Sequence, residues 1–305
     1  MDSSPIFPTF KKLELSDKQK IERFTHGFLP YSDFNFTSLW NYNIENIFEW
    51  TTLHGNLVVK FADYVTDELF LSFMGKHKIT DTIHELLKHA HEYGLAKHLK
   101  LIPEEVIHMA DEIKDHFTIE EDPDNHDYIL SIKEYLTYSG NKFASKRRNL
   151  KKFTELFPDA TVEMLDISKE SVQKDIVDIF LKWSEMKKLT QEEVKHELAA
   201  TKRFIENSMH FDHISLGIRH KGTLIAYSLL EKGEQKHLHN HFMKSLSNYR
   251  GLFEKMDHEV TKYAHQHGFT HINIQQDLGI EGLRIAKRLG RPSRFLKKYR
   301  ISHKE

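Results

Sequence analysis

Residues 272–301 hold the combination of side chains that is best suited to chemistry. Asp277 lies in a turn after an alternating segment, and Arg284, Lys287 and Arg288 follow on one side of an amphipathic helix. A carboxylate beside several cations can orient an amine or bind a carboxylate or phosphate, and ligands gather where strands end and helices begin. The simpler alternative is an aspartate that caps its own helix ahead of a solvated basic segment. The apolar side of the helix, which we expect to be buried, carries Leu283, Ile285, Ala286 and Leu289.

The second basic segment, SGNKFASKRRNLKKFTELF, has the pattern of an amphipathic helix that begins near Ser139. Lys146 falls inside its apolar stripe, and Lys142 lies at the edge of the stripe. A lysine in such a position either extends its amine to the surface or directs it into a cleft that holds an anion. The opposite side of the helix is a basic face that consists of Arg147, Arg148, Lys151 and Lys152.

Two further groupings bear on ligands. Tyr249 and Gly251 stand just before a predicted helix, where a glycine lets backbone N–H groups approach a phosphate or an acyl carbonyl. His237, His239 and His241 alternate on a predicted strand, but positions two apart lie about 7 Å from each other, too far to converge on one ion. The chain has no cysteine, so disulfides, thiolate nucleophiles and Cys-ligated zinc are excluded. Because the histidine spacing does not suit one ion either, we expect no metal.

Alternating and helical patterns suggest elements that would position these residues. The first half has predicted helices at 81–93 and 103–114 and an acidic connector at 120–127. Its predicted strands cover residues 47–52, 56–61, 69–73 and 99–102. The order of strands, a helix and a further strand recurs in the second half, so we expect two domains with the same topology.

In the second half, a Lys221-Gly222 turn joins two strands of a predicted meander, and Gly268 ends a helix at 251–267. We expect an N-terminal domain at 1–125 and a C-terminal domain with the active cleft at 126–305. The other predicted helices cover 171–187 and 191–207. The predicted strands are 160–165, 214–219, 224–231, 237–243 and 270–275.

Charge is distributed unevenly along the 305 residues. Residues 1–140 hold 13 Lys/Arg against 24 Asp/Glu, a net charge of −11, and residues 141–305 hold 31 against 21, a net charge of +10. The basic part favours an anionic ligand, although two oppositely charged parts can also simply attract each other. The N-terminus lacks the pattern of a signal peptide, and apolar runs are far shorter than the ~20 residues of a membrane span. These features predict a soluble, cytoplasmic protein.

Two long motifs resemble the phosphatidylglycerol lysyltransferase C-terminal domain family, and the resemblance extends over nearly the whole chain. The first is Asp277-Leu-Gly-Ile-Glu-Gly-Leu-Arg284-Ile-Ala-Lys287, with Pro292 and Lys297-Lys298-Tyr299 behind it. The second is Ser139-Gly140-x-Lys142-Phe143-x-x-Lys146-Arg147, and YSDFNFTSLW near the start also matches. The family implies an α+β fold of two tandem acetyltransferase-like domains, each a mainly antiparallel mixed sheet flanked by helices, similar to Fem-type peptidyl transferases.

The resemblance also implies a reaction, in which an aminoacyl group moves from charged tRNA to an acceptor. We expect Asp277, Lys146, Arg284 and Lys287 to be catalytic, with Asp277 orienting the incoming amine and the cations binding a carboxylate or phosphate. We expect the basic helix face to contact tRNA without reading its sequence. The expected substrate-binding residues are Lys142, Arg147, Arg148, Lys151, Tyr249, Gly251, Gly279 and Lys298.

Donor and acceptor stay open at this point. The donor is aminoacyl-tRNA or an acyl-coenzyme A, and the acceptor is an amine or hydroxyl of a small molecule, a peptide or a lipid head group. Coenzyme A is disfavoured, because the positions where such acetyltransferases carry Arg or Gln, Gly, and Gly or Ala are here Asn248, Gly251 and Phe253. The alternatives are a coenzyme A-dependent N-acetyltransferase and a non-catalytic module that binds RNA or protein through the same basic face.

Overall fold

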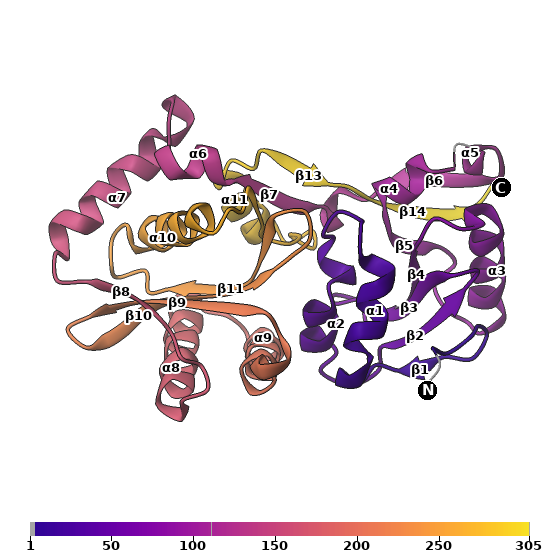
Figure 1. The fold of residues 1–305 in the computed structure, drawn as a ribbon, viewed down its shortest axis with the longest axis horizontal. Helices are drawn as coiled ribbons and strands as arrows, with labels where there is room; N and C mark the ends of the chain where they lie inside the picture. The colour runs from indigo at the N-terminus through magenta and orange to yellow at the C-terminus, as the bar shows by residue number, and fades with distance from the viewer. Residues whose placement is uncertain (1–3, 111, 305) are drawn as a thin grey trace. The chain divides into compact units, whose positions relative to one another are not determined.

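The computed structural model describes residues 4–110 and 112–304 and divides into two compact units (Figure 1). The first unit comprises the chain up to Tyr128, the segment Gln276–Leu289 and the residues from Arg294 onward. The second unit comprises Ile129–Gln275 and Gly290–Ser293. The start of the N-terminal stretch that lacks a signal-peptide pattern, residues 1–3, lies outside the described part.

The first unit contains two small antiparallel sheets with the strand orders β1-β2-β3-β4 and β5-β14-β6. The strands are β1 (Lys11–Lys12), β2 (Glu49–Leu53), β3 (Asn56–Ala62), β4 (Leu69–Met74), β5 (Leu99–Pro103), β6 (Phe117–Glu121) and β14 (Lys298–His303). The helices are α1 (Lys18–Thr25), α2 (Phe36–Tyr42), α3 (Ile79–Glu92), α4 (Glu104–His108), α5 (Ile113–His116) and α11 (Glu281–Leu289). Helices α1 and α2 lie on one side of β2–β4, and α3 lies on the other (Figure 1).

The core of the first unit follows from apolar residues on its central strands. Leu57, Val58 and Leu71 are fully buried, and Trp50 on β2 is fully buried too. The indole Nε1 of Trp50 donates to Asp17 Oδ2 at 3.0 Å, so the polar atom of this large side chain is satisfied inside the core. This packing accounts for the predicted strands at 47–52, 56–61 and 69–73, which the structure confirms within a few residues.

The second unit is built on a mixed sheet. The strand order is β13-β7-β12-β11-β10-β9-β8, in which β11 and β12 are parallel and the other described pairs are antiparallel. The strands of this sheet are β7 (Asp127–Ser131), β8 (Thr161–Met164), β9 (His213–His220), β10 (Thr223–Lys232), β11 (His237–Ser245), β12 (His271–Asn273) and β13 (Arg294–Leu296). By residue assignment, β13 and the first two residues of β7 belong to the first unit. The helices are α6 (Ile132–Thr137), α7 (Ala144–Leu156), α8 (Glu170–Lys187), α9 (Gln191–Glu206) and α10 (Leu252–Gln266).

Helices cover both faces of this sheet. Helices α8 and α9 lie on one face, and α10 lies on the other with α6 and α7 packed against it (Figure 1). Local signals set several of these elements: Thr190 and Glu193 form a capping box at the start of α9. Lys221 and Gly222 both have positive φ, as a tight hairpin turn requires, and this turn joins β9 to β10.

The mixed class with mainly antiparallel sheets flanked by helices confirms the expected fold class. The helix expected at 103–114 is interrupted between α4 and α5, and the acidic connector expected at 120–127 overlaps strand β6.

The expected boundary at residue 125 lies close to Tyr128, but the structure also assigns α11 and β14 to the first unit. The reason is pairing, because β14 is the middle strand between β5 and β6. A duplication of one plan stays a prediction.

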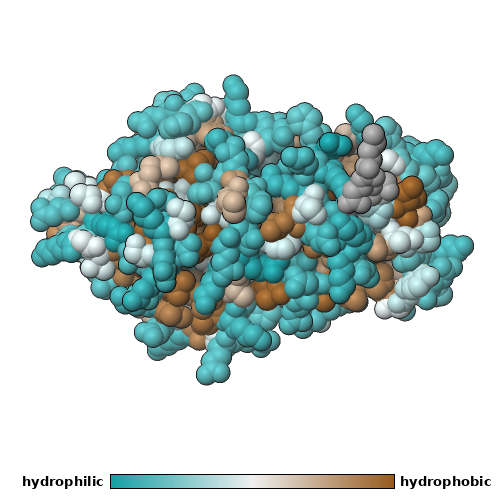
Figure 2. Space-filling view, turned by 60° about the horizontal axis from the view of Figure 1, so that its bottom comes forward, coloured by the Kyte–Doolittle hydropathy of each residue, from teal (hydrophilic) through white to brown (hydrophobic). Residues whose placement is uncertain are grey.

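Within the described residues, no helix has both the length and the apolar composition needed to cross a bilayer. One face of the molecule appears in Figure 2, where hydrophilic residues predominate and hydrophobic ones form separate small groups.

Candidate functional site

In the second unit, the parallel pair β11 and β12 separates after a short stretch of pairing. His237, Leu238 and His239 pair with His271, Ile272 and Asn273, and β12 ends there while β11 continues to Ser245. Ligands of open sheets bind beyond the carboxyl ends of strands, at points where neighbouring strands diverge. The end of β12 is therefore the position in this unit where the fold favours a ligand.

His241 lies at this point, in a β-bulge. The pairing of β10 with β11 passes from Leu229–Phe242 to Leu230–Asn240, which leaves His241 as the extra residue. The His241 ring is buried, with Nε2 3.2 Å from Glu231 Oε2 and Nδ1 3.3 Å from Gln275 Nε2. A proton on Nε2 satisfies both contacts, since the amide of Gln275 then donates to Nδ1. The rings of His239 and His241 lie stacked with their centroids 5.8 Å apart, so these two imidazoles share one face despite the bulge.

Lys146 is buried on α7 and forms an ion pair with α10. Its Nζ lies 3.1 Å from Asp257 Oδ2, and the rings of Tyr135, Tyr138 and Phe253 lie 5.0–5.8 Å from the amine. Burial raises the pKa of the Asp257 carboxyl above its usual value, and Lys146 opposes that rise. Lys146 therefore does not extend to the solvent. It links α7 to α10, and aromatic rings surround its amine.

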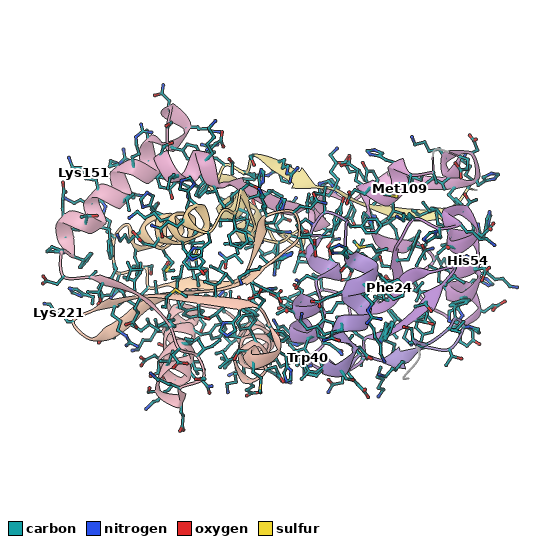
Figure 3. The ribbon with its side chains drawn as sticks, viewed as in Figure 1. Phe24, Trp40, His54, Met109, Lys151 and Lys221 are labelled. Atoms are coloured by element: carbon teal, nitrogen blue, oxygen red, sulfur yellow. The ribbon has the colours of Figure 1, made fainter. Side chains whose placement is uncertain are left out.

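The basic face of α7 separates into anchored and exposed members. Arg147 donates to the backbone carbonyls of Tyr138 and Gly140, so it holds the segment that follows α6. Lys142 binds Glu134 at 2.7 Å. Arg148 and Lys151 are exposed, and Figure 3 shows Lys151 directed away from the unit. Of the predicted substrate-binding cations on this helix, Arg148 and Lys151 have the geometry that suits an external polyanion.

Tyr249 and Gly251 lie at the start of α10. Gly251 has a φ of +83°, and an added Cβ would lie 2.1 Å from the carbonyl oxygen of Asn149 on α7. Close packing of two helices therefore requires glycine here, whether or not a ligand approaches. Tyr249 is half-buried, with its ring centroid 5.0 Å from that of Phe157.

The Asp277 cluster belongs to the first unit. Asp277 is fully buried and accepts hydrogen bonds from Tyr128 Oη at 2.5 Å, the Gly279 N–H at 2.9 Å and two guanidinium nitrogens of Arg284 at 2.9 and 2.7 Å. The same Arg284 Nη2 that donates to Asp277 Oδ1 also donates to Asp124 Oδ1 at 2.5 Å. Burial alone would raise the pKa of Asp277, but the bonds from Arg284, Tyr128 and Gly279 outweigh it and hold this pKa below its usual value. Both carboxylate oxygens are thus occupied.

A second buried cluster in the first unit surrounds Lys298. Its Nζ lies 2.8 Å from Asp127 Oδ1 and also binds Asp33, and all three side chains are almost inaccessible. Ser32 donates to Asp127 from both its backbone N–H and its hydroxyl, at 2.7 and 2.6 Å. Burial lowers the pKa of Lys298, but the two carboxylates outweigh it and raise the pKa above its usual value. Gln276 completes the cluster, since its amide contacts Ser32 and Asp33.

The predicted site residues therefore fall into two groups. Asp277, Gly279, Arg284, Lys287 and Lys298 lie in the first unit. The members in the second unit are Lys142, Lys146, Arg147, Arg148, Lys151, Tyr249 and Gly251. In the first group, Asp277 and Arg284 bind each other, and Lys287 Nζ donates to the carbonyl of Gln276 at 2.6 Å.

Sequence reasoning missed the acidic partners of these cations. Asp33 lies within the quoted motif YSDFNFTSLW, and Asp127 lies at the end of the acidic connector, so both were in view without an assigned role. Asp257 is on the buried side of α10, where a carboxylate is itself a signal that a cation lies opposite. Each of these could have been found by asking which acids lie at predicted core positions.

The family model for the C-terminal domain of phosphatidylglycerol lysyltransferase matches residues 32–302. The chain belongs to this family, whose members are acetyltransferase-like in fold and transferases in class. A comparison with curated protein sequences gave no match.

Solved structures show the same fold over nearly the whole chain. A conserved protein of unknown function from Bacteroides thetaiotaomicron is 21% identical with a TM-score of 0.84, covering 97% of this chain and 99% of that chain. L-PGS from Bacillus licheniformis is 15% identical with a TM-score of 0.61, covering 95% and 92%. FemX is 10% identical with a TM-score of 0.57, covering 97% of both chains. At these identities the likeness concerns the fold.

Proposed function

We propose that this protein is an aminoacyl-group transferase that moves an aminoacyl group from charged tRNA to an amine or hydroxyl acceptor. The observation that carries the proposal is the family match over residues 32–302, since the family is named for a lysyl transfer. The fold it shares with L-PGS and FemX along almost its full length supports the same class.

The reaction makes one bond and breaks one. The lone pair of the acceptor nitrogen or oxygen attacks the carbonyl carbon of the aminoacyl ester, and a tetrahedral oxyanion forms. The bond from that carbon to the tRNA 3′ oxygen then breaks, and the proton lost by the acceptor passes to the leaving oxygen, directly or through water. No redox partner is required.

In this proposal the second unit binds the ester where β11 and β12 separate, next to His241 and Gln275. Lys146 and Asp257 hold α7 against α10, which packs on β11. Asp277, Arg284 and Lys287 serve as positioning residues, because the bond between Asp277 and Arg284 and the bond from Lys287 to the carbonyl of Gln276 fix the loop after Gln276.

The exposed cations of α7 would bind the tRNA backbone. Arg148 and Lys151 are exposed, and contacts of this kind add affinity without reading sequence. Each phosphate contact adds roughly 0.7–0.9 to the slope of log affinity against log salt. The double variant Arg148→Gln/Lys151→Gln should therefore bind charged tRNA more weakly, with a slope smaller by about 1.5.

The decisive experiment incubates the full chain with tRNA charged with a labelled amino acid and a panel of amine, peptide and lipid acceptors. Labelled product that depends on the protein supports the proposal. Consumption of an acyl-coenzyme A in place of charged tRNA would replace it with the acetyltransferase alternative. If neither donor is consumed while tRNA is retained, the protein is a binding module.

A matched control uses two other exposed lysines. The double variant Lys182→Gln/Lys195→Gln removes the same charge from α8 and α9. It should bind tRNA and transfer the aminoacyl group as the wild type does. An equal loss in both double variants would mean that net charge acts rather than the α7 surface, and the proposed tRNA-binding role of Arg148 and Lys151 would be abandoned.

A further inference from the structure

Helix α11 and strand β8 both expose apolar side chains. On α11, Ile285 is 53% exposed and Leu289 is 62% exposed, and no residue of the helix is buried. The expectation that Leu283, Ile285, Ala286 and Leu289 are buried is therefore wrong, because acids of the first unit attract the cations of the helix inward. A helix satisfies its backbone hydrogen bonds internally, whereas a strand at the edge of a sheet leaves half of its backbone groups open. Strand β8 therefore defines the geometry of a partner more closely than α11 does.

Strand β8 is the last strand of the seven-stranded sheet and pairs with β9 on one side. The Leu165 N–H donates to the Ser215 carbonyl at 2.8 Å, just after the strand. Hydrogen-bonded pairs recur at every second residue of an antiparallel ladder, so Glu163 bonds to β9 as well. The N–H and C=O groups of Val162 and Met164 therefore point away from β9. We call these outward groups the open edge of β8.

The side chains of β8 divide between the two faces of the sheet. Glu163 Oε1 accepts from Arg219 Nε at 2.6 Å, and Arg219 also binds Asp175 of α8 at 2.7 Å, so Glu163 lies on the face that α8 covers. Val162 and Met164 project from the opposite face, where they are 39% and 56% exposed. The charge on the strand is thus paired, and its apolar side chains contact solvent.

Proteins usually protect a sheet edge with a charge, a proline or a bulge. Other edge strands of this chain follow that rule, since β1 consists of two lysines, β6 ends in two exposed glutamates and β13 begins with an exposed arginine. Strand β8 contains no proline, and its register with β9 has no bulge. Its charge, on Glu163, is held by Arg219. The open edge of β8 is therefore suited to pairing with another strand.

A second copy of this chain fits the open edge. A two-fold axis through Glu163 sets Val162 of one copy opposite Met164 of the other, on both sides of the axis, when the two β8 strands run antiparallel. The outward groups of these residues then form hydrogen-bonded pairs, and their side chains meet on one face. The two Glu163 side chains lie on the other face, where Arg219 already pairs with each.

Charge and area also bear on the partner. The carboxylate of the strand is paired, so the edge offers no charge that would select an acidic or basic peptide over a second copy. Two strands of four residues bury less than the ~1,200–2,000 Å² of a stable interface, and exposed Leu156 at the end of α7 adds apolar surface on the face of Val162 and Met164. The dimer should accordingly be weak.

We propose that β8 is the interface of a weak symmetric dimer, in which the β8 strands of two copies pair antiparallel and join the two sheets into one. The dimer goes beyond the proposed transfer reaction and does not rest on it, because strand pairing requires neither tRNA nor an acceptor.

Analytical ultracentrifugation of the full chain tests the proposal. The wild type should pass from monomer to dimer with a Kd on the order of 10 μM. Met164→Lys should raise this Kd by about ten-fold or more, because it places a charge on the open edge. Met209→Lys is the matched control, since Met209 is 85% exposed outside the sheet. It should dimerise as the wild type does.

A second variant removes one outward donor. Val162→Pro lacks the N–H that points away from β9, and proline is tolerated on an edge strand when its nitrogen faces away from the ladder. This variant should keep a Tm close to that of the wild type and should stay monomeric at ~200 μM, about twenty times the expected Kd.

Hydrogen exchange measured for single residues identifies the strand. Raising the wild-type concentration from below to above Kd should slow exchange several-fold at the N–H groups of Val162 and Met164. The N–H of Glu163, which bonds to β9 in the monomer, should change little. A wild type that stays monomeric at ~200 μM, or a dimer with unchanged exchange at Val162 and Met164, would refute the proposal. A dimer that persists in both Met164→Lys and Val162→Pro would place the interface elsewhere.

Discussion

At the scale of single residues, the buried acids decide what the cations do. Lys298 lies between Asp33 and Asp127, Lys146 faces Asp257, and Arg284 faces Asp277. Charges removed from water are tolerated only when they are paired. Three of the predicted site cations therefore form ion pairs with buried acids. In the proposed function these pairs act by positioning the neighbouring segments of the chain.

The Asp277–Arg284 pair should stabilise the protein in a pH-dependent manner. Asp277→Asn leaves Arg284 without its buried partner, and we expect a loss of about 3 kcal/mol in the free energy of unfolding at pH 7. Because the folded state lowers the pKa of Asp277, this contribution is complete above the unfolded value near 3.9 and disappears as the pH falls through the folded value. Urea unfolding of the wild type and of Asp277→Asn between pH 3 and 7 measures this contribution. A difference in the free energy of unfolding that is as large at pH 3 as at pH 7 would contradict a stabilising role for the ionised Asp277.

Gly251 provides a residue-scale test of packing between α7 and α10. An added Cβ would lie 2.1 Å from a backbone oxygen of Asn149 at a positive φ, so we expect Gly251→Ala to cost about 3 kcal/mol or more. Gly268→Ala is the control, because Gly268 has a similar φ of +78° but open space around it. It should cost only about 1–2 kcal/mol. Calorimetry compares the stabilities of the two variants. Equal losses in Gly251→Ala and Gly268→Ala would show that the positive φ, and not the contact with Asn149, causes the loss.

At the scale of elements, local chemistry sets where helices begin. Thr190 Oγ1 accepts the N–H of Glu193 at 3.2 Å, and Glu193 Oε2 accepts the N–H of Thr190 at 2.7 Å. Thr190→Ala removes this cap of α9 and should cost about 1 kcal/mol, or about 2–4 °C in Tm. The control Thr154→Ala, on exposed α7, should change Tm by less than about 1 °C, since its hydroxyl only bonds the carbonyl of Leu150. If the cap did not stabilise α9, Thr190→Ala and Thr154→Ala would have similar Tm values.

Element prediction from sequence worked where the signal was local. The strands of the meander, the turn at Lys221-Gly222 and helices α8, α9 and α10 follow from periodicity, turn chemistry and capping. The short strands β13 and β14 were missed because basic residues mask any alternation there. Their existence depends on partners far away in sequence.

At the scale of the whole molecule, the C-terminal segment belongs to the first unit. Strand β14 lies between β5 and β6, and α11 is held by Asp124 and Asp277. A chain ending at residue 275 should therefore leave the first unit without its middle strand and unable to fold. Limited proteolysis with mass spectrometry should find residues 1–128 degraded rapidly. A chain ending at residue 303 is the control, because it retains β14; rapid degradation of both would point to a different cause.

The sequence by itself determined the family, the mixed fold class and most long helices, because these depend on motifs and on patterns within a few residues. It did not determine which acids meet which cations, since Asp127 and Lys298 are 171 positions apart. Only the tertiary structure decided which side of α11 faces the protein. A helical pattern separates a charged side from an apolar one, but the buried carboxylates of the first unit determine which side turns inward.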